Sequence, residues 1–291
     1  MRPTLLTIAR RALEGPCALA RGETLLVAVS GGPDSMALLH AAAKLSSQLG
    51  VRVAAHGVDH GLRAGAGAEL DAAEAFARSL DVPTTRSRVS LARGGNVQER
   101  ARLARYEALE RAAREHGASA IATAHHADDR AETVLIRLLR GAGAAGLGVL
   151  RADGATPSGA TRLVRPLLAA RREDVLAHIS RHRIPTAEDP SNADARYLRA
   201  RVRHELLPLM AELSPGIVDH LNALADDLLG AENAPIRLPR RALVAIAELA
   251  RARSESATVR LPKGLVVSYE GPIVRSKRRG PNPSLDGKHR T

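Results

Sequence analysis

From residue 24 onward, short apolar runs alternate with segments whose apolar residues recur at helical spacing. The apolar runs are rich in Val, Ile, Leu and Ala, which predicts strands that are buried on both faces. The predicted strands are Thr24–Ser30, Val51–His56, Thr84–Val89, Ser119–Ala124 and Arg162–Val164, and the predicted helices are Asp34–Leu49, Ala68–Leu80, Asn96–Gly117, Asp128–Arg140 and Arg171–His182. This repeated order of strand and helix predicts an α/β fold, with a parallel sheet covered by helices on both faces.

The pattern changes near residue 215, where we place the end of the first domain. Helices are predicted for Ile217–Leu229 and Ala242–Arg251, followed by a strand-turn-strand unit over Val259–Val274. The last residues are rich in Lys, Arg, Pro and Gly, a composition typical of disordered segments. The sequence therefore predicts a first domain at 1–215, a smaller and mainly helical domain at 216–274, and a basic, disordered tail at 275–291.

The charge balance indicates what kind of partner to expect. The chain has 43 Lys and Arg residues against 31 Asp and Glu residues, a formal net charge of +12. Such an excess favours a polyanion such as nucleic acid, although an Arg-rich proteome and a basic tail would also produce it. With three Tyr, one Phe and no Trp, the chain is poorly suited to RNA-binding modules that stack bases on aromatic side chains.

Cysteine usage and hydropathy indicate the compartment. Cys17 is the single cysteine, so the chain forms no intramolecular disulfide, as is usual in the cytosol. No apolar run approaches the ~20 residues that span a bilayer. The basic N-terminal segment lacks the long apolar region of a signal peptide and predicts a short amphipathic helix. We therefore expect a soluble, cytoplasmic protein without a membrane partner.

The segment SGGPDS, Ser30–Ser35, joins the first predicted strand to its helix. Gly31 and Gly32 can adopt positive φ and let the backbone approach an anion, while the helix N-terminus offers amide donors for phosphate. No Walker-type motif is present, and G-x-G-x-x-G does not follow the first strand. The simpler alternative is an ordinary strand-to-helix turn capped by Asp34.

Two further polar groups follow predicted strands. Asp129 and Glu132 are three residues apart, which places both carboxylates on one helical face just after His125. They could hold a metal, bind a cationic substrate or accept protons, or they could simply favour a solvated helix N-terminus. Zinc is disfavoured, because the adjacent His and Asp pairs at 125–126 and 128–129 lack the spacing of structural zinc ligands.

The loop after the second strand, VDHGLR, carries Asp59, His60 and Arg63. Parallel sheets bind ligands at the carboxyl ends of their strands, so these side chains could meet a nucleotide. Taken alone, the segment is more typical of a polar surface loop than of a nucleotide site.

SGGPDS resembles the SGG-x-DS signature of the PP-loop ATP pyrophosphatase superfamily. The resemblance implies that the protein binds ATP with magnesium, cleaves it between the α- and β-phosphates, and adenylates an oxygen of its substrate. It also implies that the loop holds the leaving pyrophosphate. The positions implied to bind ATP are Ser30, Gly31, Gly32, Pro33, Asp34 and Ser35, with Asp34 as the candidate magnesium ligand.

Four more segments resemble one family of that superfamily, the tRNA(Ile)-lysidine synthases. AHHADDRAETVLIRLLRGAGAAGL is similar to the family's AHH-x-DD-x-x-ET…L-x-RG-x-G…GL, and VDHGLR to its VDH-x-LR loop. NVQERARLARYEAL is similar to its N-…-AR-x-x-RY helix, and EDPSN with YLRARVRHELLPLM to its closing motif EDPSN…RN-x-IRH-x-LLP-x-L. The chain departs from the pattern at Arg130, where Gln is usual, and at Ala200, where Asn is usual.

The resemblance implies ATP-dependent ligation of free L-lysine to C2 of the wobble cytidine of the CAU-anticodon isoleucine tRNA. The reaction would pass through an adenylated tRNA and yield lysidine, AMP and pyrophosphate. Asp129 and Glu132 would bind lysine and, with Asp34 and Arg102, form the catalytic set. The remaining implied contacts are Asp59, His60, Arg63 and His125 to ATP, and Arg201 and Arg203 to tRNA or phosphate.

Three alternatives remain at the sequence level. A tRNA thiolase of the same superfamily would need catalytic cysteines beyond Cys17. A catalytically inactive RNA-binding homologue would have no reason to keep both the loop and the acidic pair. A relative of GMP synthetase would explain neither the charge nor the later motifs. Whether the protein forms a homodimer stays open.

Overall fold

The structure is a computed structural model that describes residues 2–59, 66–89, 97–187 and 198–233, together with three strands after residue 255. The chain divides into two compact units, Met1–Asn233 and Ala234–Thr291. Within the described residues, no helix has the length and apolar character needed to cross a bilayer.

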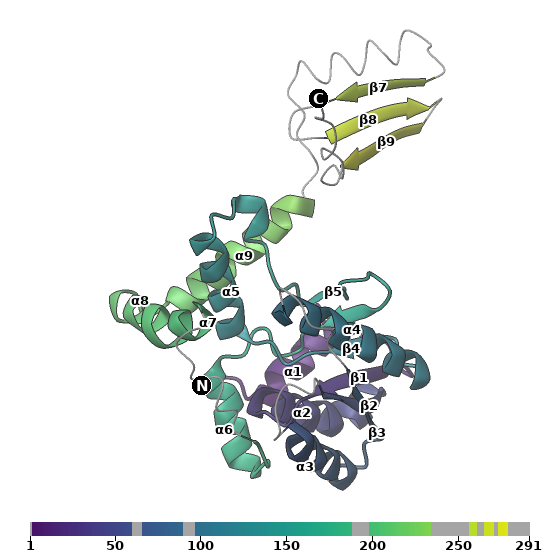
Figure 1. The fold of residues 1–291 in the computed structure, drawn as a ribbon, viewed down its shortest axis with the longest axis vertical. Helices are drawn as coiled ribbons and strands as arrows, with labels where there is room; N and C mark the ends of the chain where they lie inside the picture. Colours follow the sequence, from purple (N-terminus) through teal and green to yellow (C-terminus); the bar gives the residue numbers. More distant parts are fainter. Residues whose placement is uncertain are drawn as a thin grey trace, which may run out of the picture. The chain divides into compact units, whose positions relative to one another are not determined.

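The first unit is built around a six-stranded sheet with the order β3-β2-β1-β4-β6-β5 (Figure 1). The parallel strands are β1 (Thr24–Val29), β2 (Arg52–Asp59), β3 (Thr84–Arg88), β4 (Ala120–Ala122) and β6 (Arg162–Val164). The short β5 (Asp153–Ala155) pairs antiparallel with β6 at the edge. Because β2 and β4 flank β1 on opposite sides, the strand order reverses at β1, and this reversal is where open α/β sheets bind ligands.

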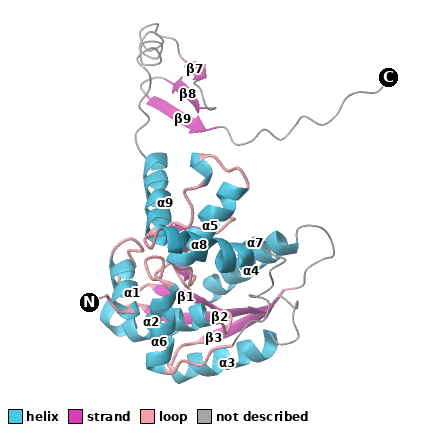
Figure 2. Ribbon diagram, turned by 90° about the vertical axis from the view of Figure 1, so that its left-hand side faces the viewer, coloured by secondary structure: helices cyan, strands magenta, loops and turns pink. Residues whose placement is uncertain are grey.

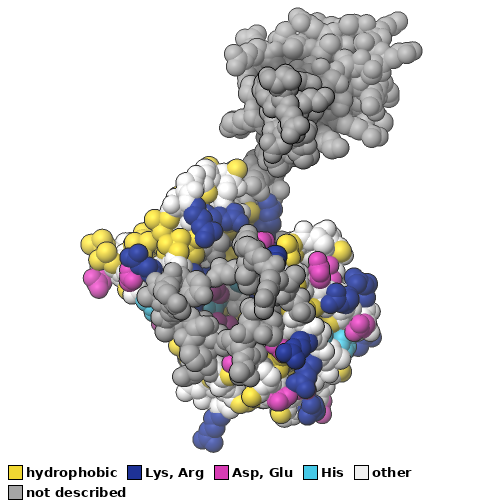
Figure 3. Space-filling view, in the orientation of Figure 1, with side chains coloured by type: hydrophobic (Ala, Val, Ile, Leu, Met, Phe, Trp, Pro, Cys, Tyr) yellow, Lys and Arg dark blue, Asp and Glu magenta, His cyan; other side chains and the backbone are white. Residues whose placement is uncertain are grey.

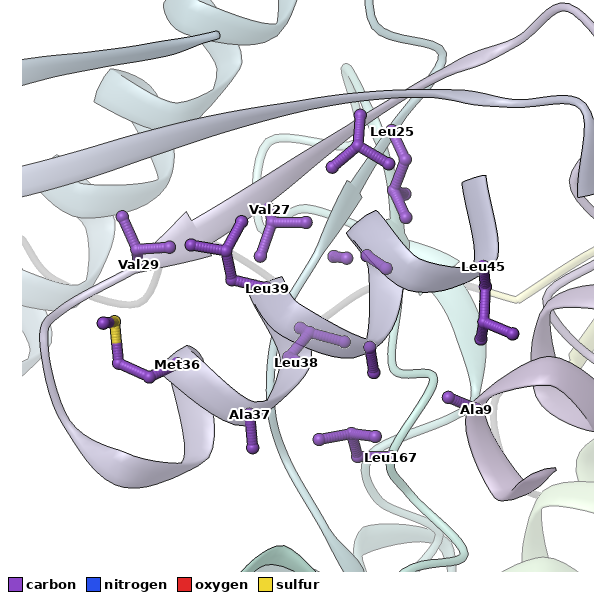
Figure 4. Packing of buried hydrophobic residues seen from close by; sticks show 14 of the residues in the cluster. Ala9, Leu25, Val27, Val29, Met36, Ala37, Leu38, Leu39, Leu45 and Leu167 are labelled. Carbon is purple, nitrogen blue, oxygen red and sulfur yellow. The ribbon is translucent and has the colours of Figure 1, made fainter. Parts of the chain in front are cut away.

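Helices cover both faces of the sheet, as the uninterrupted apolar strands require. Leu25, Val27 and Val29 of β1 point to one face, where they pack with α1 (Leu5–Glu14) and α2 (Pro33–Leu49) (Figure 4). The alternate residue Leu26 points to the other face, toward α4 (Val97–Glu115). The helices α3 (Ala66–Ser79) and α6 (Arg172–His182) complete the first layer.

A second, smaller apolar cluster lies among helices rather than on the sheet. It joins α5 (Ala127–Leu139), α8 (Leu207–Leu213) and α9 (Ile217–Asn233), which lie together in both ribbon views (Figure 2). A short α7 (Leu198–Arg201) and one turn of π-helix (Val202–Leu206) lead into α8. This wide turn precedes Pro208, which has no N–H for an ordinary helical hydrogen bond. A 3-10 turn, η1 (Ala144–Gly146), follows α5.

The fold class agrees with the sequence prediction, but three details differ. β5 was not predicted, because Asp153–Ala155 has neither an apolar run nor β-branched residues. The predicted domain boundary at 215 precedes α9, yet α9 packs on α5 and belongs to the first unit.

The third difference concerns the second unit. Its described strands are β7 (Ser256–Arg260), β8 (Leu265–Glu270) and β9 (Ile273–Arg278), an antiparallel sheet. Residues 275–278 therefore belong to a strand and not to the predicted disordered tail. The predicted helix Ala242–Arg251 and the tail from residue 279 lie outside the described residues.

Candidate active site

The Ser30–Ser35 loop and the start of α5 lie at the same edge of the sheet. The loop follows β1, and His125 and α5 follow β4, which pairs directly with β1 in parallel register. The carboxyl ends of neighbouring parallel strands lie on one edge, so the two groups lie together at the point where the strand order reverses, which is where open α/β sheets bind ligands.

The loop has the geometry of a phosphate cradle. Gly31 has a φ of +80°, and a Cβ at that position would lie 2.7 Å from the carbonyl oxygen of Glu69. Gly32 caps α2 without a side-chain bond. The Ser35 hydroxyl donates to the Gly32 carbonyl at 2.9 Å and accepts the Ser30 amide at 3.1 Å, which ties the ends of the loop together. Hydroxyls and helix-terminal amides are thus gathered where an oxyanion can bind.

Asp34, in the first turn of α2, is close to the other carboxylates of the site. The fully buried His126 has its Nε2 at 3.7 Å from Asp34 Oδ1 and 3.5 Å from Asp129 Oδ2, and its Nδ1 at 3.6 Å from Asp128 Oδ2. Burial raises the pKa of Asp34; the His126 side chain opposes the rise and the Asp129 carboxylate adds to it. A cation bound at Asp34 would relieve this cost.

Asp129 and Glu132 lie on one face of α5, and both are buried. Asp129 Oδ2 accepts the backbone N–H of His126 at 3.1 Å in a capping box, which leaves Oδ1 for other partners. Burial alone would raise the pKa of Asp129, but His126, His125 and Arg199 together hold that pKa below its ordinary value. The Oδ2 atom of Asp129 therefore stabilises the helix, as in the simpler alternative above, whereas Oδ1 pairs with the arginines described next.

Two arginines from the segment after α6 close over the acidic pair. Arg199 donates to Glu132 Oε2 at 2.9 Å and to Asp129 Oδ1 at 3.2 Å. Arg203 donates to both Glu132 oxygens, at 2.5 Å from Nε to Oε1 and 3.0 Å from Nη2 to Oε2, and to Asp129 Oδ1 at 3.3 Å. The two carboxylates and two guanidiniums form a neutral, partly buried cluster. The negative charge of Asp129 and Glu132 is therefore balanced by Arg199 and Arg203 in this structure.

A model of the PP-loop domain family matches residues 5–210, more than half of the chain. The protein belongs to the PP-loop domain family. The Ser30–Ser35 segment lies within the matched range, and because it resembles the signature of the superfamily we call it the PP-loop. The family is one of ATP-binding domains.

Named relatives come from the same family. The chain is 42% identical over 217 residues to a tRNA(Ile)-lysidine synthase of Thermobifida fusca, covering 74% of this chain and 64% of the relative. It is 43% identical over 202 residues to a tRNA(Ile)-lysidine synthase of Novosphingobium aromaticivorans, covering 69% of this chain and 61% of the relative. The chain therefore spans less than two thirds of the length of either relative.

Among solved structures, the U34-tRNA thiolase NcsA from Methanococcus maripaludis, with its 4Fe-4S cluster, superimposes with a TM-score of 0.65. The two chains are 18% identical, and the match covers 79% of this chain and 80% of NcsA. This likeness shows a common PP-loop fold.

The other predicted site residues are spread more widely. His125 is half-buried after β4, and desolvation lowers its pKa to about 3, so it is a neutral hydrogen-bonding group at pH 7. Asp59 ends β2 at the same sheet edge, 3.6 Å from Arg88. Arg102 pairs with Glu99 at 3.3 Å on the surface of α4. His60 and Arg63 lie outside the described residues.

The two predicted phosphate contacts behave differently from each other. Arg201 is exposed and pairs with Glu205 along the helix at 2.9 Å, whereas Arg203 is directed at the acidic pair. Neither side chain contacts a Ser30–Ser35 side chain in the described structure. Their predicted role toward phosphate thus requires Arg203 to exchange its partners.

The structure shows the surroundings of the two residues that depart from the family pattern. Arg130 is buried and points away from the acidic pair: it donates to the carbonyl of Val149 at 3.0 Å and to Asp226 of α9 at 2.5 Å. Its positive charge is therefore paired with Asp226 rather than with Asp129 and Glu132. Ala200 is buried between Arg199 and Arg201, where a small side chain fits.

Sequence reasoning missed two residues of the site. His126 was considered only as a zinc ligand, although its position between two acidic positions was a usable signal. Arg199 was part of a quoted motif but received no role, because only the fold brings α7 over α5. The structure also shows that Asp128 is structural: its Oδ2 accepts the Arg172 amide at 2.8 Å and so caps α6.

The described residues contain no group of three or more His, Cys, Asp or Glu side chains arranged to hold a metal ion. Magnesium often uses one or two carboxylates with substrate phosphates as its other ligands. Asp34 fits that requirement, because its side chain is one-third exposed in the first turn of α2, and burial raises its pKa, a cost that a bound cation would offset.

Proposed function

We propose that this PP-loop protein ligates free L-lysine to C2 of the wobble cytidine of the CAU-anticodon isoleucine tRNA, using ATP. The observation that supports it best is the juxtaposition of the phosphate cradle and the buried acidic pair, with His126 within 3.7 Å of Asp34 and 3.5 Å of Asp129. One part suits a nucleotide and the other suits an ammonium group. The names of the relatives point to the same reaction.

In the first step, the PP-loop would hold the β- and γ-phosphates of ATP while the cytidine oxygen attacks the α-phosphate. The amides at the start of α2 and the hydroxyls of Ser30 and Ser35 would bind the leaving pyrophosphate. Asp34 would hold magnesium, which supplies charge neutralisation to the phosphates. His125, neutral at pH 7, would offer a hydrogen bond at the same edge.

In the second step, Asp129 and Glu132 would bind the lysine ammonium. A free lysine amine has a pKa near 10.4 and must lose a proton before it attacks C2. Asp129 or Glu132 would accept that proton. Since the cluster is already neutral with Arg199 and Arg203, we infer that one guanidinium leaves when lysine enters and turns to a phosphate of ATP or tRNA.

The test separates the two steps. Asp129→Asn keeps the capping oxygen of α5 but removes a charge, so ATP binding should persist within about threefold. Incorporation of labelled lysine into tRNA should fall at least about 100-fold, as expected when one buried charge partner is lost. Asp71→Asn on the exposed face of α3 is the matched control and should keep both properties. Loss of ATP binding with retained lysine affinity would contradict the assignment.

A thiolase reaction has less support, despite the likeness to NcsA in fold. Iron–sulfur clusters are held by cysteine thiolates, and this chain has one cysteine. Cys17 is fully buried, its Sγ–H donates to the Ala152 carbonyl at 3.4 Å, and burial raises the pKa of its thiol. It is a buried core residue that precedes β1, and the described chain places no second cysteine beside it.

A further inference from the structure

A buried arginine without an acidic partner lies at the carboxyl end of β6. Arg165 is 8% exposed and donates one Nη1–H to the Arg151 carbonyl at 2.6 Å, but its Nε–H has no acceptor. No carboxylate of the described chain forms an ion pair with it. Burial lowers the pKa of Arg165, which reflects the cost of keeping this charge away from water. An uncompensated buried cation is strongly unfavourable unless something else pairs with it.

A second arginine, on α4, also has a buried N–H donor without an acceptor. The Nε–H of Arg105 is also buried without an acceptor, and the described chain offers it no carboxylate. Its guanidinium carbon lies 5.3 Å from the centre of the Tyr106 ring. Tyr106 is itself buried, and its phenol opposes the lowering of the Arg165 pKa by burial. Tyr106 therefore neighbours both arginines.

The position of this pair is significant. β6 is the neighbour of β4 in parallel register, so Arg165 emerges on the same sheet edge as His125 and the PP-loop. The charges of Arg165 and Arg105 both act on His125 and help to lower its pKa. Arg165 thus lies on the β6 side of the PP-loop, away from β2.

We propose that Arg105 and Arg165, which both neighbour Tyr106, form a second phosphate-binding site beside the PP-loop. The site rests on the proposed function in that its ligand is a phosphate group of the RNA backbone or of ATP. In each arginine the free Nε–H is one arm of the guanidinium fork that binds phosphate oxygens in bidentate fashion. A bound phosphate would supply the acceptors and the negative charge that both side chains lack.

The first experiment uses inorganic phosphate as the probe. In thermal unfolding, phosphate should raise the Tm of the wild-type protein, because it binds the folded state only. Arg105→Met and Arg165→Met keep side-chain length without charge, and each should lose part of that rise, while the part that comes from phosphate at the PP-loop stays. Arg10→Met on the surface of α1, where Arg10 pairs with Glu14, is the matched control and should keep it.

The second experiment identifies the source of the phosphate. Binding of ATP and of a tRNA transcript is measured for the same variants over a range of salt. If the ligand is an RNA phosphate, each Met variant should bind the transcript about tenfold more weakly, with a salt slope lower by about one, and bind ATP normally. If the ligand is an ATP phosphate, ATP affinity should fall and the salt slope for RNA should stay unchanged.

The site is ruled out if folded Met variants bind phosphate, ATP and tRNA as the wild type does. If Arg165→Met does not fold, Arg165→Lys is used in its place. Because this variant keeps the charge, its Tm without phosphate should match that of the wild type. Its affinity for phosphate should fall several-fold, since Lys lacks the guanidinium fork. Unchanged binding in that variant would also overturn the site. Lysine incorporation by the wild type is measured in parallel. If the wild type makes no lysidine but binds phosphate through Arg165, the proposed function is wrong and the phosphate site stands.

Discussion

At the scale of single residues, Gly31 shows how little freedom the PP-loop allows. Its positive φ is unfavourable for side chains in general, and the Glu69 carbonyl occupies the space that a Cβ would need. The loop therefore depends on a contact from α3, an element distant in sequence.

Gly31→Ala should lower the free energy of unfolding by about 2–4 kcal/mol, from left-handed strain and the displaced backbone together. ATP binding should be lost with it. Gly22→Ala is the control, because Gly22 also has a positive φ, of +86°, but open space around it. That variant should lose only about 1–2 kcal/mol in chemical denaturation and keep ATP binding. Equal losses in both variants would show that the Glu69 contact is unimportant.

The acidic pair illustrates what residue types can and cannot predict. The i, i+3 spacing of Asp129 and Glu132 was enough to place both carboxylates on one face. Their pairing with Arg199 and Arg203 could not be predicted, because it depends on how residues 198–206 return across α5. The same limit applies to Arg130, whose charge is neutralised by a residue 96 positions later.

At the scale of elements, Arg130 and Asp226 connect α5 to α9. The Arg130 side chain on α5 is buried, whereas the Asp226 side chain on α9 is about two-thirds exposed. The pair therefore helps to hold α9, and the loop at Val149, against the helix that carries the acidic pair.

A double-mutant cycle tests this connection. Asp226→Ala should cost about 1–3 kcal/mol of unfolding free energy, because it leaves a buried guanidinium donor unsatisfied. In an Arg130→Gln background, with the residue usual in the lysidine synthases, the same change should cost less than about 0.5 kcal/mol. Additive effects in urea unfolding would mean that the two side chains do not act together.

A second connection between elements, α2 to α6, depends on neutral histidines. His40 Nδ1 and His178 Nε2 are 2.9 Å apart, and desolvation lowers the pKa of each to about 4. His182, Lys44 and Arg181 are the cationic or titratable groups nearby, and each opposes protonation of one or the other histidine.

This contact should make stability depend on pH. Between pH 6.5 and about 4 the unfolded histidines bind protons that the folded pair does not, so stability is present above pH 6.5 and falls as the pH drops toward 4. The Tm of the wild type should therefore decrease more steeply from pH 7 to pH 5 than that of the His40→Gln, His178→Gln double variant. His56 keeps its own lowered pKa in both proteins, so the difference isolates the pair. Parallel Tm profiles would contradict this interpretation.

The elements themselves were predictable in proportion to their apolar signal. β1 and α2 were placed within one residue, because an apolar run, two glycines and Pro33 mark their boundary. β5 has no such signal and is defined only by pairing with β6. The place of α9 also had to come from packing, since its apolar face fits a separate domain as well as it fits α5.

At the scale of the whole molecule, positive charge is the dominant property. Lys and Arg side chains are distributed over the visible face, while hydrophobic atoms gather near α8, where Leu209 and Leu213 are exposed (Figure 3). With a net charge of +12, tRNA binding should rely strongly on phosphate contacts and weaken steeply as salt rises.

The basic C-terminal residues allow a measurement of this dependence. Because β9 ends at Arg278, a deletion should begin at residue 279 so that the strand stays intact. Removing residues 279–291, with Arg279, Lys288 and Arg290, should lower the slope of log K against log salt by up to about 2–3 and leave ATP binding unchanged. An unaltered slope for tRNA would show that these residues do not contact the nucleic acid.

The two borders of the main sheet limit how copies of this protein can associate. On one border, β3 carries Arg86 and Arg88, which are engaged with acidic neighbours; on the other, β5 has three residues and includes Gly154. Charged or very short outer strands discourage the edge-to-edge pairing by which sheets of separate molecules fuse. Both borders therefore disfavour growth of this sheet into a continuous intermolecular one, and pairing of main-sheet edges is a poor route to a homodimer.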